Sequence, residues 1–281
     1  MKNFTLYTIP SILLGVLILF AAIFFASETG HTRPYKSDIY YPSGEGPFPV
    51  IILSHGRGGP SVGYHKKAEG MVRNGRAAVV VLDHYSARGD YGAKFRKFPK
   101  FWVAREWREK DIQDLLRTLK DDAKINKDKV ILAGWSAGSG IVLPFISNPR
   151  RLTPPEGITI VGAILTYPYT AGCHEEIDSF NVPVIIHFGK LDGNDGNPLS
   201  GYHCWKKKVE NFSDGKLPVT FKEYDDAYHG YDLVFLKNRP KRCQRRTYRD
   251  GVGKICLAFN QSAFKQAIVA NKKFLKQLLD N

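Results

Sequence analysis

The segment that decides the fold is Val130-Ile-Leu-Ala-Gly-Trp-Ser-Ala-Gly-Ser-Gly140. Its apolar residues 130–133 are typical of a buried strand, and a helix-compatible run follows from Ile141. Between them lies the pattern Gly-x-Ser-x-Gly, which marks a sharp strand-to-helix turn with a strained serine and with glycines that let strand and helix approach closely. The segment therefore predicts that the side chain of Ser136 projects from the carboxyl edge of a sheet.

Two backbone amides near this turn are candidates for binding an oxyanion. The first is Ala137 N–H, because it follows the serine at the N-terminus of the expected helix. The second is Arg57 N–H, in the turn Ser54-His-Gly-Arg-Gly-Gly59 that follows an apolar strand at residues 49–53. A glycine-rich turn of this kind can equally be a plain connector.

An acid and a base follow the serine in the chain. Asp192 comes just after the apolar run 182–188, where an acid can orient a catalytic histidine, and Asp195 is the alternative. His229 lies in a loop after the alternating segment 218–224. The order Ser136, Asp192, His229 is that of nucleophile, acid and base in one large class of hydrolases.

His84 is a rival base, because it follows the apolar run 77–82 at the same expected sheet edge. It precedes Ser136 in the chain, and the sequence shows no acid arranged to orient it. We therefore favour His229 as the general base.

Apolar runs alternate with helix-forming segments along the chain, which predicts an α/β fold with a mostly parallel, doubly wound sheet flanked by helices. The strands are expected at 37–41, 49–53, 77–82, 130–133, 158–165, 182–188 and 218–224, and the helices at 64–74, 106–119 and near the C-terminus from 264 to 279.

Composition indicates one packed catalytic domain, residues 28–281. The chain has 281 residues, of which 43% are hydrophobic and 12% aromatic, so widespread disorder is excluded. The formal net charge of +14 is concentrated at 94–110 and 239–249. No nucleic-acid-binding motif accompanies it, so we expect a solvated cationic surface and no nucleic-acid partner.

The N-terminal residues 1–27 differ from the rest, since residues 3–27 carry no charged side chain. This length of apolar chain predicts a membrane-spanning helix that is either a signal-anchor or a cleaved signal peptide. Phe24 and Phe25 spoil a small-residue cleavage site, which favours the anchor. The flanking charges do not settle the orientation.

Four cysteines give an even count without a zinc-binding spacing: Cys173, Cys204, Cys243 and Cys256. Three pairings are possible, and four buried thiols in a cytosolic domain are the alternative. With the N-terminal segment, the count favours an exported, oxidising location in which Cys173 pairs with Cys204 and Cys243 with Cys256.

The chain resembles the dienelactone hydrolase family of the α/β-hydrolase superfamily. The resemblance rests on Leu53-Ser-His-Gly56, Asp83 with Arg88-Gly89, Gly134-Trp-Ser-Ala-Gly138, Gly189–Asp192 and Tyr228-His-Gly230. It implies the α/β-hydrolase fold, here preceded by one N-terminal hydrophobic helix. The founding members use a cysteine nucleophile where this sequence has Ser136, so the resemblance points to exported, serine-type members and leaves the dienelactone substrate open. It also implies a Cys173–Cys204 bridge.

We therefore expect a serine hydrolase that cleaves a small carboxylic ester, lactone or thioester through an acyl-enzyme. Ser136 attacks, His229 transfers the proton, Asp192 supports His229, and the amides of Ala137 and Arg57 bind the oxyanion. No metal or organic cofactor is implied. A peptidase or acyltransferase on the same fold, or an inactive membrane-tethered binding protein, are alternatives. The expected location is the membrane or the exterior, with the catalytic domain periplasmic or secreted; the sequence does not set the oligomeric state.

Overall fold

The computed structural model describes residues 35–73, 76–89, 101–148, 151–168, 177, 179–192, 202–212, 219–248 and 251–280. Tyr35–Asn281 form one compact unit. The predicted hydrophobic helix in residues 1–27 lies outside the described residues. Within those described ranges, no helix is long and apolar enough to span a bilayer.

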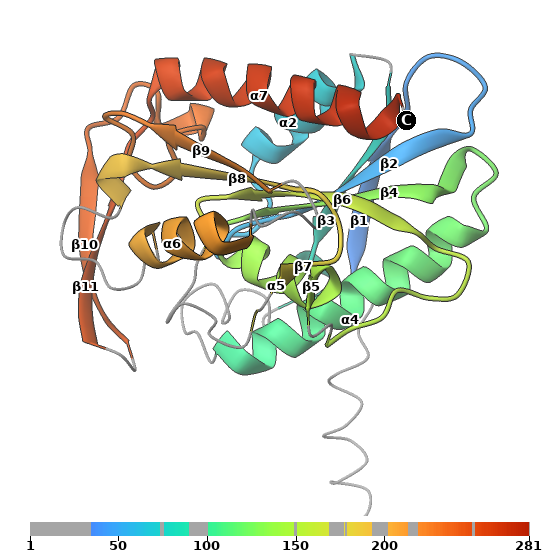
Figure 1. Ribbon diagram of the computed structural model, residues 1–281, viewed down its shortest axis with the longest axis horizontal. Helices are drawn as coiled ribbons and strands as arrows, with labels where there is room; N and C mark the ends of the chain where they lie inside the picture. Colours follow the sequence, from blue (N-terminus) through green and yellow to red (C-terminus); the bar gives the residue numbers. More distant parts are fainter. Residues whose placement is uncertain are drawn as a thin grey trace, which may run out of the picture. The chain divides into compact units, whose positions relative to one another are not determined.

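A seven-stranded sheet forms the centre of the fold, in the order β1-β3-β2-β4-β6-β8-β9 (Figure 1). Strand β1 pairs antiparallel with β3, and all other neighbours are parallel. The strands are β1 (Lys36–Tyr40), β2 (Phe48–Ser54), β3 (Ala78–Asp83), β4 (Ile125–Trp135), β6 (Ile160–Thr166), β8 (Val184–Gly189) and β9 (Val219–Tyr224).

Helices cover both faces of this sheet, as Figure 1 shows. One face carries α2 (Val62–Val72) and α7 (Gln261–Leu279), and the other carries α4 (Phe101–Lys120), α5 (Ala137–Ile146) and α6 (Tyr202–Phe212). Short 3₁₀ helices come after three of the strands: η2 (Ser86–Arg88) after β3, η3 (Lys190–Asp192) directly after β8, and η4 (Val234–Leu236) after β9. The layers are those of a doubly wound α/β protein.

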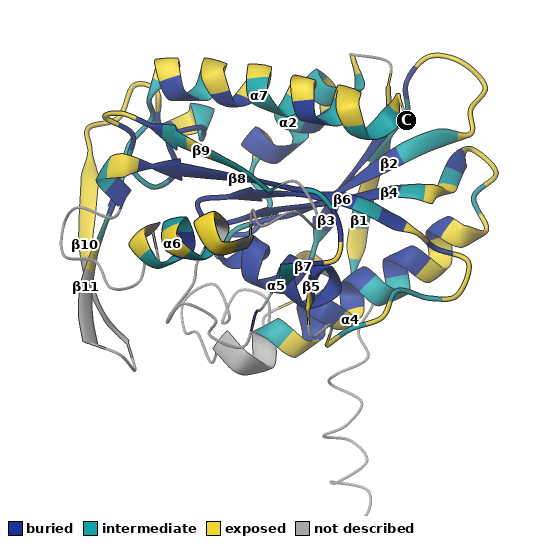
Figure 2. Ribbon diagram, viewed as in Figure 1, coloured by how far each residue is buried: buried dark blue, intermediate teal, exposed yellow. Residues whose placement is uncertain are grey.

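Two apolar layers hold the helices to the sheet, and they account for the burial of its central strands (Figure 2). In β3, Ala78, Val80 and Leu82 pack toward α4 and α5, whereas Val79 and Val81 pack toward α2 and α7. Because successive side chains of a strand point to opposite faces, a strand covered on both sides must be apolar throughout. This explains why these strands read as continuous apolar runs.

The predicted strands and helices are confirmed, with boundaries shifted by a few residues. The sequence reasoning missed the antiparallel hairpin of β10 (Arg242–Tyr248) and β11 (Gly251–Leu257), and the short ladder of β5 (Ser147–Asn148) and β7 (Ser179–Phe180). The hairpin is rich in arginine and lacks the apolar alternation that signals a strand. It forms a sheet of its own, separate from the central one.

Candidate active site

Ser136 occupies the tight turn between β4 and α5. Its backbone has φ 52° and ψ −119°, a conformation that non-glycine residues rarely adopt. The turn is fixed because Ser136 N–H donates to Thr166 O at 2.9 Å and Ser139 N–H donates to Ser136 O at 3.0 Å. Ser136 is partly exposed although its neighbours on both sides are buried.

Gly138 allows the start of α5 to pack directly against the end of β2. A Cβ atom at this position would lie 2.1 Å from Ser54 O and 2.6 Å from His55 O, far inside van der Waals contact. The glycine therefore brings the turn that contains Ser136 beside the loop that begins at Ser54. This is the physical reason for the last glycine of the Gly-x-Ser-x-Gly pattern.

Ser136, His229 and Asp192 lie in one hydrogen-bonded chain. His229 Nε2 is 2.9 Å from Ser136 Oγ, and His229 Nδ1 is 2.8 Å from Asp192 Oδ2. With its proton on Nδ1, the imidazole donates to the carboxylate and accepts from the serine hydroxyl. The structure thus brings together the three residues predicted as nucleophile, base and acid.

The acid and the base are set beside each other by a second close approach. Asp192 is buried in η3, directly after β8, and His229 follows β9 in a loop. A Cβ atom on Gly189 would lie 2.2 Å from Ala227 O, so only glycine lets the end of β8 approach the loop that carries His229. Leu191 N–H donates to Ala227 O at 3.0 Å and closes this contact.

The predicted oxyanion amides occupy suitable elements. Ala137 is the first residue of α5, and Arg57 lies in the loop after β2 that packs against Gly138. That loop is held by Gly56 N–H, which donates to Tyr64 Oη of α2 at 2.9 Å. The arrangement suits an oxyanion site, and the assignment of both amides stays a prediction.

The expectation that His84 has no orienting acid is wrong. Its Nδ1 lies 2.8 Å from Asp111 Oδ2, and its Nε2 lies 3.2 Å from Ser54 Oγ. No local motif marks this contact, because Asp111 lies on α4, 27 residues after His84. Burial, with the charges of Arg108 and Arg88, lowers the pKa of His84 well below its ordinary value.

This second Ser-His-Asp arrangement is structural. His84 and Ser54 are fully buried, so no substrate reaches them. Arg88 clamps Asp111 through two hydrogen bonds of 2.8 and 2.7 Å, and Arg108 donates to the carbonyl of His55. The cluster links the end of β3 to the loop after β2. Ser136, the serine beside His229, is by contrast partly exposed.

Sequence reasoning also missed Tyr167, which packs against the candidate base. Its ring centroid is 4.5 Å from that of His229, and its backbone has φ 35°. Tyr167 N–H donates to His187 O at 2.7 Å, which fixes this conformation at the end of β6. No motif marks Tyr167, because its contact is with His229, 62 positions further along the chain.

The cysteines are only partly described. Cys243 and Cys256 form a disulfide across β10 and β11, which confirms that predicted pair. Cys204 is also disulfide-bonded. Cys173, its predicted partner, lies outside the described residues, as does the alternative acid Asp195.

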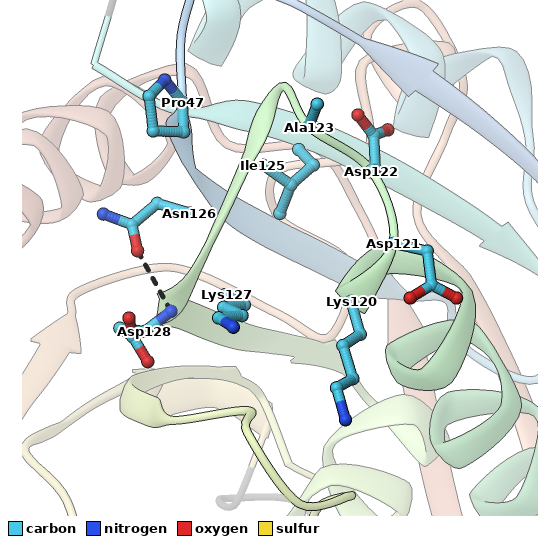
Figure 3. A pocket seen from close by; sticks show the side chains of 9 residues that line it. All are labelled: Pro47, Lys120, Asp121, Asp122, Ala123, Ile125, Asn126, Lys127 and Asp128. Carbon is cyan, nitrogen blue, oxygen red and sulfur yellow. Dashed lines mark hydrogen bonds between the residues drawn. The ribbon is translucent and has the colours of Figure 1, made fainter.

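A surface hollow lies at the other end of the sheet (Figure 3). It surrounds the start of β4, whereas Ser136 follows its end, and a strand of this length spans about 35 Å. Its lining residues are Pro47, Lys120, Asp121, Asp122, Ala123, Ile125, Asn126, Lys127 and Asp128. Across the described ranges, no cluster of three or more His, Cys, Asp or Glu side chains could hold a metal ion.

Comparison with known proteins gives a likeness in structure alone. No family model matches the sequence, and no curated protein matches it. A dienelactone hydrolase-like promiscuous phosphotriesterase from metagenomic libraries has a TM-score of 0.62 and 14% identity, over 89% of this chain and 95% of that one.

Two further solved structures share the fold. A thermophilic esterase from the Planctomycetes species Thermogutta terrifontis, with propionate bound, has a TM-score of 0.59 and 16% identity over 86% of this chain and 89% of its own. A dienelactone hydrolase from Anabaena variabilis has a TM-score of 0.50 and 15% identity over 69% and 82%. The protein therefore has the α/β-hydrolase fold.

Proposed function

We propose that this protein is a serine hydrolase of the dienelactone hydrolase type that cleaves a small carboxylic ester, lactone or thioester. The observation that carries the proposal is the hydrogen-bonded chain from Ser136 through His229 to Asp192, with a partly exposed serine in a strained turn. The names of the proteins that share its fold, two hydrolases and an esterase among them, support the same reaction class.

The proposed mechanism assigns a step to each residue. His229 Nε2 accepts the proton of Ser136 Oγ as the oxygen attacks the substrate carbonyl, and the buried Asp192 carboxylate stabilises the imidazolium that forms. The amides of Ala137 and Arg57 bind the tetrahedral oxyanion. His229 then protonates the leaving oxygen or sulfur, and water repeats the sequence to release the acid.

Labelling with a fluorophosphonate probe tests this proposal, because the probe reacts only with an activated serine. Wild type should label, and Ser136→Ala should not label at all. His229→Ala should react with the probe about 10⁴-fold more slowly than wild type, and its hydrolysis of p-nitrophenyl acetate should slow by at least the same factor. Removing the serine or the histidine of a triad abolishes most of its activity.

Ser262→Ala provides a matched serine control. Ser262 lies exposed in the first turn of α7, where it accepts only from Gln266 Nε2 at 3.0 Å. This variant should label like wild type. A Ser136→Ala protein that keeps activity within tenfold of wild type would remove the proposed mechanism.

We also propose that residues 1–27 anchor or export the domain, so that it works outside the cytoplasm. The bonded Cys243–Cys256 pair supports an oxidising compartment. Membrane fractionation of cells that express the full chain, followed by sequencing of the mature N-terminus, distinguishes an anchor from a cleaved signal peptide. Recovery of the intact chain in the cytosol would contradict both.

A further inference from the structure

Asp232 is a buried carboxylate three residues after His229. Its side chain is only 7% exposed. Trp135 Nε1 donates to Oδ2 at 2.8 Å, and Tyr167 Oη donates to Oδ1 at 2.7 Å. Lys67 Nζ, from α2, donates to Oδ2 at 2.7 Å and to the backbone carbonyl of Asp232 at 2.9 Å. One carboxylate thus joins three separate parts of the fold.

The charge state of this cluster is set by its partners. Burial alone would raise the pKa of Asp232, but the Lys67 ammonium and the hydrogen bonds from Tyr167 and Trp135 hold it below its usual value. Burial, reinforced by the negative charge of Asp232, raises the pKa of Tyr167 well above its usual value. Asp232 is therefore ionised and Tyr167 is protonated at neutral pH, as their hydrogen bond requires.

Two partners of Asp232 adjoin candidate catalytic residues, and the third, Lys67, lies on α2. Trp135 immediately precedes Ser136 in the strained turn, and Tyr167 packs its ring 4.5 Å from that of His229. On α2, one turn before Lys67, the Tyr64 hydroxyl accepts from Gly56 N–H in the loop that contains Arg57. Asp232 itself contacts none of the reacting atoms.

We propose that Asp232 is a positioning residue, whose carboxylate fixes Trp135 and Tyr167 and through them sets the Ser136 turn and the His229 ring in reactive geometry. The inference rests on the proposed function. It predicts that Asp232 acts on the turnover rate and has little effect on substrate affinity, because its partners Trp135 and Tyr167 adjoin Ser136 and His229, the residues that transfer the proton in the proposed mechanism.

A plain salt bridge would not explain the arrangement. A buried ion pair adds little net stability, and an apolar pair of equal volume often serves as well. The two oxygens of Asp232, however, each accept from a different ring donor, Trp135 Nε1 and Tyr167 Oη. An asparagine has one acceptor oxygen and cannot satisfy both donors in the same way.

Two variants separate positioning from stability. Asp232→Asn leaves Lys67 buried without a counter-charge and should lower the thermal midpoint. The double variant Lys67→Met with Asp232→Asn removes both charges, so its midpoint should recover toward wild type. In both proteins kcat for p-nitrophenyl acetate should fall about 100-fold while KM stays within threefold, as expected for a misplacement of about 1 Å.

Tyr167→Phe and Glu109→Gln complete the design. Tyr167→Phe removes only the hydroxyl that Asp232 holds, preserves the packing, and should lower kcat about tenfold or more. Glu109 is the matched control, because it is another buried carboxylate with 7% side-chain exposure, and its ion-pair partners are Arg105, at 2.7 Å, and Arg151, neither of which is a partner of Asp232. Glu109→Gln should lower the midpoint and leave kcat within about twofold.

The outcomes are distinct. Recovery of kcat together with the midpoint in the double variant, or a wild-type kcat in folded Asp232→Asn or in Tyr167→Phe, would overturn the inference. If the Asp232 variants do not fold, Tyr167→Phe decides. Failure of the wild type to label with the fluorophosphonate would instead overturn the proposed function.

Discussion

Ser136 carries local strain that the rest of the fold must maintain. A non-glycine residue at φ 52° and ψ −119° costs about 1–3 kcal/mol, and substituting alanine leaves that cost in place. Glycine removes it. In an ordinary helix or strand, glycine is instead less stable than alanine by about 0.5–1 kcal/mol. The two effects oppose each other at this position.

We therefore expect Ser136→Gly to be at least as stable as Ser136→Ala, although both are inactive. Urea unfolding of the two proteins measures the difference in free energy of unfolding. An alanine variant more stable than the glycine variant by about 1 kcal/mol, the normal preference, would show that the turn relaxes in the absence of the serine.

Gly138 is the second residue at which local geometry is decisive. Gly138→Ala forces a methyl group against the carbonyl of Ser54, and should cost several kcal/mol of stability or displace the Ser136 turn and abolish labelling. Gly70→Ala is the control: Gly70 lies within α2, and beyond its chain neighbours and the nearby backbone of its own helix no atom comes within 4 Å of the added carbon. It should stabilise the protein by about 0.5–1 kcal/mol. Similar behaviour of the two variants in urea would refute this account.

Among the elements, the β10–β11 hairpin depends most on a covalent bond. It pairs only with itself in the ladder that contains the opposed Cys243 and Cys256, and isolated two-stranded hairpins are marginally stable. Its end nevertheless contacts the site. Leu257 forms an isolated parallel β-bridge with His229, and Ala258 N–H donates to His229 O at 3.4 Å. The disulfide thus secures an element that adjoins the candidate base.

Replacing both cysteines by serine should loosen this hairpin selectively. A disulfide that closes a loop of this size stabilises the closed hairpin by about 3 kcal/mol, because it lowers the entropy of the open form. Without it the open form is more populated, so trypsin cleavage between Arg242 and Lys254 should accelerate by up to about 100-fold. Peptide mapping after reduction identifies the cut sites. Sites outside the hairpin serve as the internal control, and equal hairpin cleavage in both proteins would mean that packing alone holds it.

For the whole molecule, buried histidines make stability depend on pH. His187 of β8 lies between Tyr224 Oη at 2.6 Å and Asn271 Oδ1 at 2.8 Å, and burial lowers its pKa from 6.5 to about 4. Below pH 6.5 the unfolded chain binds a proton that the folded chain excludes. The stabilisation is therefore complete above that pH and is lost as the pH falls through about 4.

The free energy of unfolding should accordingly fall by roughly 3 kcal/mol from this group between pH 7.5 and pH 4. Buried Asp111 has the opposite effect on the free energy of unfolding as the pH falls. Burial raises its pKa, although the charge of Arg88 lowers it, so the folded chain binds this proton more readily than the unfolded chain. Comparing wild type with His187→Gln by urea unfolding at both pH values isolates the histidine. A constant difference between the two proteins would show that the fold does not lower the pKa of His187.

The sequence by itself determined the local features of this protein. Continuous apolar runs identify strands buried on both faces, and Gly-x-Ser-x-Gly identifies the strained turn, because both signals arise within a few neighbouring residues. The order of Ser136, Asp192 and His229 also follows from motifs at strand ends. The Cys243–Cys256 pair was predicted, but the β10–β11 hairpin was not, since its strands lack apolar alternation.

Only the tertiary structure decided which side chains meet. Asp111 reaches His84 from α4, and Asp232 joins Lys67, Trp135 and Tyr167, residues that are scattered through the chain. No local pattern marks such contacts. A buried charge needs a counter-charge and hydrogen-bond partners, and these come from residues far away in the sequence that only the fold brings together. Sequence therefore located the candidate catalytic residues, while the fold revealed the groups that contact them.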